Sequence, residues 1–127
     1  MAEEPQQLSH SDPGPTGLEA RAGGPDFSFD LLGIGMSILD DLQVVEEFPS
    51  TTGVTEVKEA ALMGGGPVPT ALCAAARLGA TAAIIDRVGD DWKGEHIRKD
   101  FERFGVGTRF LEVERGRTSS FGTILVR

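Results

Sequence analysis

A pair of carboxylates and a run of glycines are the residues in this sequence best suited to chemistry. Asp40 and Asp41 follow a short apolar run, residues 29–36, that has the composition of a buried strand. Three consecutive glycines, residues 64–66, stand directly before a segment with helical composition. Glycine lacks the Cβ that would keep a ligand away from the backbone. Because ligands gather at the carboxyl ends of strands in parallel sheets, these residues predict a ligand site.

Each of these features also has a structural explanation that the residues leave open. An Asp pair after a strand is common in solvated turns, and a glycine-rich turn before a helix can be a plain tight connection. Asp90 and Asp91 precede a second helical segment, where helix capping accounts for them. A dinucleotide-binding fingerprint is excluded, because Gly33 and Gly35 have no third glycine at the required spacing and no helix follows them.

The elements that would position these residues alternate between strands and helices. Residues 29–36 and 81–88 are nearly continuous apolar runs, typical of strands buried on both faces of a parallel sheet. One helix is expected from about Pro69 to Gly79, and a second helix after Asp91. The order strand, helix, strand predicts a right-handed crossover and a parallel strand pair. The fold class is therefore expected to be α/β.

Two further strand candidates interrupt this order. Residues 42–48 and 54–62 are β-branched or alternating, and they lie between the first core strand and the first helix. They predict a small sheet that stands off the main one and serves as a lid, a dimer surface, or both. Residues 109–114 and 119–126 are two more strand candidates at the end of the sequence.

Composition narrows the classes of function. The sequence has 12 basic and 20 acidic residues, a net charge of -8, and no basic cluster, which argues against binding nucleic acid or an anionic membrane. Cys73 is the single cysteine and cannot form an intrachain disulfide, while His10 and His96 lack metal-ligand spacing, so no metal site is predicted. With no apolar run that crosses a bilayer and no signal peptide, a cytoplasmic protein is expected.

The sequence divides into a tail and a folded region. Residues 1–26 are rich in Pro, Gly, Glu, Gln and Ser, and they predict a disordered N-terminal tail because they cannot bury enough apolar surface. Residues 27–127 are expected to form the folded domain. The sequence stops within an apolar strand segment, so this domain is expected to be truncated.

The order and spacing of several motifs resemble the N-terminal portion of the PfkB, or ribokinase-like, carbohydrate kinase family. These motifs are a strand ending in Gly-x-Gly with an Asp after it (Gly33, Gly35, Asp40), a Gly-Gly pair opening a helix (Gly65, Gly66), Ala-Arg-Leu-Gly-Ala at residues 76–80, and Val-Gly-Asp-Asp-x-x-Gly at residues 88–94. The similarity runs from about Asp30 to the last residue. It implies a ribokinase-like fold, with a Rossmann-like, mostly parallel sheet, flanking helices and a small β-sheet lid.

The resemblance also implies substrate-binding roles for four residues. Asp40 matches the family's substrate-contacting Asp, whose carboxylate would accept hydrogen bonds from two neighbouring sugar hydroxyl groups. Gly65 and Gly66 match the pair whose backbone lies against the sugar. Thr70 stands where family members usually carry Asn, which leaves the identity of the sugar open.

The activity implied by the resemblance is transfer of the γ-phosphoryl group of ATP, with Mg²⁺, to a hydroxyl group of a sugar or nucleoside. The family's base lies in a Gly-Ala-Gly-Asp motif, and this sequence contains no such motif. The base, the anion hole and the nucleotide site are therefore expected outside this chain, which alone is predicted to be inactive. The alternative is a non-catalytic sugar-sensing or dimerisation module, with a homodimer formed through the lid strands.

Overall fold

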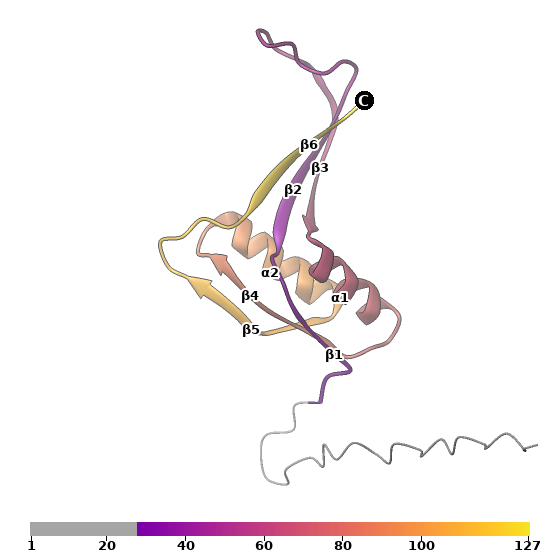
Figure 1. Cartoon of the computed structure of the whole chain (residues 1–127), viewed down its shortest axis with the longest axis vertical. Helices are drawn as coiled ribbons and strands as arrows, with labels where there is room; N and C mark the ends of the chain where they lie inside the picture. Colours follow the sequence, from indigo (N-terminus) through magenta and orange to yellow (C-terminus); the bar gives the residue numbers. More distant parts are fainter. Residues whose placement is uncertain (1–27) are drawn as a thin grey trace, which may run out of the picture.

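The computed structural model describes residues 28–127, which form two sheets and two helices (Figure 1). The elements in chain order are β1 (Leu31–Ile34), β2 (Ile38–Val45), β3 (Val57–Gly65), α1 (Pro67–Arg77), β4 (Ala82–Gly89), α2 (Trp92–Phe104), β5 (Val106–Glu114) and β6 (Phe121–Val126). The tail predicted for residues 1–26 lies outside the described residues.

Strands β1, β4 and β5 form a core sheet in the order β1-β4-β5, and every pairing in it is parallel. The predicted parallel pair is confirmed, with Leu31 of β1 opposite Ala82 of β4. One apolar cluster joins this sheet to both helices, and it includes Leu72 of α1, Ile84 of β4 and Phe101 of α2. Both helices therefore pack on the same face of the core sheet.

Helix α1 packs directly on the backbone of β1. A Cβ added at Gly33 would lie 2.6 Å from Cγ1 of Val68 and 2.7 Å from Cδ1 of Leu72, and one added at Gly35 would lie 2.6 Å from Cβ of Val68. Any larger side chain at either glycine would push the helix away from the sheet. The Gly-x-Gly pattern at the end of this strand thus serves close helix packing.

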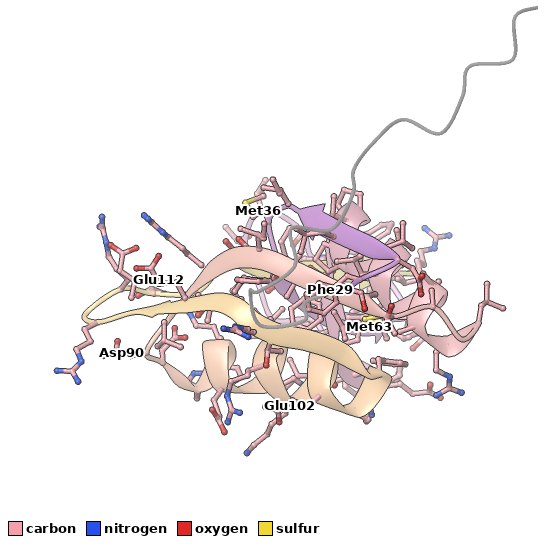
Figure 2. All side chains as sticks on the ribbon, turned by 90° about the horizontal axis from the view of Figure 1, so that it is seen from below. Phe29, Met36, Met63, Asp90, Glu102 and Glu112 are labelled. Atoms are coloured by element: carbon pink, nitrogen blue, oxygen red, sulfur yellow. The ribbon has the colours of Figure 1, made fainter. Side chains whose placement is uncertain are left out.

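The prediction that the first strand is buried on both faces is wrong. Leu32 is 51% exposed and Ile34 is 75% exposed. Within residues 28–127, β1 is an edge strand and both helices cover the opposite face, so these side chains have nothing packed over them. Figure 2 shows the two sides of the sheet, with Glu102 on α2 and Met36 on the uncovered side.

The predicted accessory sheet is present and rises from the core sheet (Figure 1). Its strand order is β3-β2-β6, with β2 antiparallel to β3 and parallel to β6. We call these three strands the lid. Leu39 of β2 is fully buried and belongs to the core cluster, so it joins the base of the lid to the core.

Two boundaries at the lid differ from the prediction. Strand β2 begins at Ile38, so Asp40 and Asp41 are strand residues rather than residues of a turn. Helix α1 begins at Pro67 rather than near Pro69, because β3 extends to Gly65, which pairs with Ile38. The glycine run is therefore mostly strand, and the connection to the helix is compressed into one residue.

Candidate functional site

Asp40 lies in the middle strand of the lid, between two glycines on the neighbouring strands. Its partner on β6 is Gly122, and its partner on β3 is Met63, two residues before Gly65. A Cβ added at Gly65 would overlap Oδ2 of Asp40, and one added at Gly122 would lie 2.8 Å from Oδ1. The carboxylate of Asp40 therefore occupies space that is free only because both glycines lack side chains.

The two neighbouring aspartates do not form a pair of catalytic carboxylates. Successive side chains in a strand point to opposite faces, so Asp40 and Asp41 lie on opposite faces of the lid. Oδ2 of Asp41 accepts a hydrogen bond of 2.6 Å from Nε2 of Gln43. Asp41 also borders an open hollow with Trp92 and Phe121, whose rings meet edge to face with centroids 6.1 Å apart.

Gly66 and Thr70 lie at the start of α1. Gly66 is the N-cap residue with φ of 103°, and a Cβ there would overlap the carbonyl oxygen of Met36, so both backbone conformation and space require glycine. Thr70 donates its amide N–H to the carbonyl oxygen of Gly66 at 3.0 Å. Its side chain lies on the wall of a cavity between α1 and α2.

This cavity has a volume of about 290 Å³, and its wall includes Gly65 and Thr70 but not Asp40. Burial raises the pKa of Cys73 on the same wall, and Asp100 adds to the effect. The thiol is therefore not an activated nucleophile. Of the four predicted residues, the structure brings Asp40 and Gly65 together and sets Gly66 next to Gly65 in the chain, while Thr70 shares the cavity wall with Gly65 but not with Asp40.

Sequence reasoning missed Ser37 and Asp86, which hold the chain where β1 passes into the lid. The amide and the hydroxyl of Ser37 both donate hydrogen bonds of 2.6 Å to Oδ2 of Asp86 on β4. Ser37 is buried, so this contact is shielded from water. The available signal was an aspartate that directly follows the apolar residues 82–85 within one predicted strand.

Asp91 caps α2 and also binds the loop that leads into β6. Its Oδ1 accepts from the Gly94 amide at 2.9 Å and from Oγ of Ser119 at 2.7 Å, and its Oδ2 accepts from the Ser119 amide at 3.1 Å. Oγ of Ser119 in turn accepts the amide N–H of Gly89 at 2.9 Å. The predicted capping role of Asp91 is confirmed, and the lid contact through Ser119 is an addition.

Hydrogen bonding keeps the Asp91 carboxylate charged. Burial acts to raise the pKa of Asp91, but the bonds from Oγ of Ser119 and from the amides of Gly94 and Ser119 outweigh it. The pKa of Asp91 is therefore held well below its usual range. A carboxylate that stays ionised in this way cannot accept a proton from a substrate near neutral pH, so Asp91 has a structural role.

Between residues 28 and 127, no three His, Cys, Asp or Glu side chains are grouped closely enough to hold a metal ion. Neither described helix is long and apolar enough to cross a membrane.

Comparison with known proteins relates this chain to carbohydrate and nucleoside kinases. The sequence profile described as pfkB family carbohydrate kinase matches residues 30–127. A nucleoside kinase of Methanothermobacter thermautotrophicus is 29% identical over 77 residues, which is 61% of this chain and 25% of that protein.

Solved structures show the same fold. A protein of Agrobacterium tumefaciens described as a candidate ribokinase is 30% identical, with a TM-score of 0.70 over 76% of this chain and 31% of that chain. The ribokinase of Arabidopsis thaliana, solved with ribose and ATP, is 16% identical, with a TM-score of 0.71 over 80% of this chain and 33% of that chain. The chain thus spans a quarter to a third of the length of these proteins.

Proposed function

Because the chain belongs to the pfkB family of carbohydrate kinases, we propose that it is the substrate-binding portion of a kinase that phosphorylates a hydroxyl group of a sugar or nucleoside. The fold is ribokinase-like, with a parallel core sheet, flanking helices and a small lid. One observation carries the proposal, the placement of the Asp40 carboxylate between Gly65 and Gly122. A cytoplasmic location, where ATP is available, belongs to the same proposal.

This arrangement suits the recognition of a polyhydroxylated molecule. A carboxylate presents two oxygens, and each can accept a hydrogen bond from one of two adjacent hydroxyl groups. Because Gly65 and Gly122 carry no side chains, the Asp40 carboxylate fits between their strands, and no side chain at either position competes with a sugar for its oxygens. Asp40, Gly65 and Gly66 are therefore the proposed binding residues, with Thr70 as a more distant candidate.

ATP with Mg²⁺ is the phosphoryl donor in this proposal, supported by the Arabidopsis ribokinase solved with ribose and ATP. The described residues, 28–127, do not fit a site for the nucleotide and its metal ion. No acidic cluster that could hold the ion exists among residues 28–127, and the sequence has no Gly-Ala-Gly-Asp segment. The phosphoryl-transfer step is therefore not assigned to any residue here.

Titration calorimetry of the 127-residue chain with D-ribose and with adenosine tests substrate binding. We expect at least one of them to bind, and Asp40→Asn to weaken that binding roughly tenfold to a hundredfold, because it removes hydrogen bonds to a charged acceptor. Asp41→Asn is the matched control, since it makes the same change on the opposite face and should leave the affinity unchanged. Equal affinity in wild type and Asp40→Asn, or no binding of either probe, would reject the proposal.

A coupled ADP-release assay tests the predicted inactivity of the chain alone. We expect no ATP turnover above background with D-ribose or adenosine, because the sequence lacks the Gly-Ala-Gly-Asp segment whose aspartate would activate the acceptor hydroxyl. Turnover that co-purifies with the wild-type chain and disappears in Asp40→Asn would show that this expectation is wrong.

A non-catalytic module that dimerises through the lid is the second candidate. It is favoured by apolar side chains that the lid leaves exposed, including Leu62, Met63, Phe121 and Ile124. Burying such a surface in a symmetric homodimer would remove it from water. Sedimentation at several concentrations, with Ile124→Lys as the interface variant, distinguishes a dimer from a monomer.

A further inference from the structure

We propose that Asp100 of α2 is a positioning residue that fixes the end of β3, and through it the backbone beside Asp40. This inference rests on the proposed substrate site, because its consequence for binding requires that Asp40 contact the substrate. Asp100 lies outside that site, and it belongs to none of the family motifs found in this sequence.

Besides the apolar contacts of Leu39 and Phe121 with the core, three carboxylates of the core bind the base of the lid. In every case the carboxylate accepts a hydrogen bond from a backbone amide at the base of the lid. The three pairs are Asp86 with Ser37, Asp91 with Ser119, and Asp100 with Gly64.

Two of these attachments are buried and have more than one hydrogen bond. Ser37 is 3% exposed and Ser119 is 5% exposed, and each donates both its amide and its hydroxyl to its carboxylate. Such bonds are protected from competing water. The chain entering β2 and the chain entering β6 are therefore fixed to the core.

The third attachment is a single, exposed hydrogen bond. The amide of Gly64 donates to Oδ2 of Asp100 at 3.0 Å. In the described structure, β3 is an edge strand, so amides on its outer side have no neighbouring strand to bond with. Gly64 carries no side chain that could contact α2, so the hydrogen bond from its amide to Asp100 is what joins it to that helix.

Two side chains of α2, Arg103 and His96, lie beside the Asp100 carboxylate. Oδ1 lies 3.1 Å from Nη2 of Arg103, and Oδ2 lies 3.8 Å from Nε2 of His96. The side chain of Asp100 is 17% exposed, and it lines the cavity between α1 and α2 beside Gly64. Asp100 is thus oriented by its own helix toward the last residues of β3.

The position of Gly64 determines the space around Asp40. Gly64 directly precedes Gly65, where an added Cβ would overlap Oδ2 of Asp40. If the end of β3 moved outward, the gap between Gly65 and the carboxylate would change, although Asp40 itself stayed on β2. Asp100 therefore acts on the proposed site through the backbone of β3.

Amide hydrogen exchange of Gly64, followed by NMR, tests the attachment without any substrate. We expect Asp100→Ala to speed exchange about tenfold, since it removes the acceptor. Asp100→Asn keeps an acceptor oxygen and should restore slow exchange. Arg103→Gln removes the ion pair that orients the carboxylate but keeps the acceptor, so it should speed exchange less than Asp100→Ala does. Unchanged exchange in Asp100→Ala, or an equal effect of Arg103→Gln, would overturn the proposal.

Trp92 provides the folding control for these variants. It is the single tryptophan, and it packs against Phe121 of β6 near the buried attachment. Its emission should be the same in Asp100→Ala and in wild type if only the β3 attachment has been lost. A red-shifted emission in Asp100→Ala would show general loosening and would count against a specific role for Asp100.

Titration with D-ribose and adenosine then tests the effect on the site. Asp100→Ala should weaken binding about tenfold, and Asp100→Asn should rescue it. Faster Gly64 exchange in Asp100→Ala with unchanged affinity would overturn the positioning role. Absence of binding in wild type would overturn the proposed function instead, and the exchange results would still decide whether Asp100 anchors β3.

Discussion

The core sheet and the lid each have three strands, but the strands of the lid are more exposed to solvent than the central strand of the core sheet. The central core strand β4 contributes Ile84 and Val88 to a cluster with both helices, whereas β3 of the lid is exposed from Val57 to Gly64. Figure 1 shows the lid standing free above its base. The core therefore supplies most of the burial that stabilises the fold, and a few polar contacts at the base orient the lid.

This contrast predicts that changes in the core affect folding and changes in the lid affect binding. Phe101→Ala should lower the free energy of unfolding by about 3–5 kcal/mol, because it leaves a cavity between α2 and the core sheet. Leu62→Ala, on the exposed side of β3, should cost less than about 1 kcal/mol. Urea unfolding of both variants measures the difference. Similar costs would show that the lid stabilises the fold as much as the core does.

Two glycine substitutions, one in the core and one in the lid, test this difference between folding and binding. A Cβ at Gly94 would overlap the backbone carbonyl of Gly89, so Gly94→Ala should destabilise the protein by about 1–3 kcal/mol. A Cβ at Gly65 meets only the end of the Asp40 side chain, which can rotate away.

Gly65→Ala should therefore leave the urea midpoint nearly unchanged but abolish the binding of D-ribose or adenosine. Calorimetry and urea unfolding on the same preparations give both values. A Gly65→Ala variant that unfolds as readily as Gly94→Ala, or that binds like wild type, would contradict the division between the two regions.

The attachment at Asp91 should weaken in acid. Its folded-state pKa lies below the unfolded value of about 3.9, so the stabilisation is complete above that pH and is lost as the pH falls toward the folded pKa. Asp91→Asn keeps the cap but not the charge, and at pH 7 it should be less stable than wild type by about 1 kcal/mol. Urea unfolding between pH 7 and pH 3 should show this gap closing in acid. A gap that stays constant would exclude the carboxylate charge as its cause.

The smallest effect is expected at the far end of the lid. Nζ of Lys58 lies 3.1 Å from Oε2 of Glu56 and 3.8 Å from Oε2 of Glu46, and all three side chains are exposed. Lys58→Ala should change the free energy of unfolding by less than about 0.5 kcal/mol, because water and salt screen such pairs. A larger loss in urea unfolding at 0.1 M salt would mean that this end of the lid is better ordered than its exposure implies.

Local patterns in the sequence were enough to predict the order of the elements. Apolar runs, glycines after helices and an aspartate before α2 each act within a few residues of the chain, so they can be recognised without the fold. The boundaries near the glycines were less accurate. Whether Gly64 and Gly65 continue a strand depends on their pairing with β2, which no local pattern contains.

By itself, the sequence determined the α/β class, the accessory strands, the N-cap of α2 and the family to which the chain belongs. Only the tertiary structure decided that Asp40 lies between Gly65 and Gly122, that Asp91 and Asp100 hold the lid, and that β1 is exposed on one side. The physical reason is the range of the interactions. Helix periods and caps are set by neighbours in the chain, whereas strand register and layer packing join residues that are distant in it.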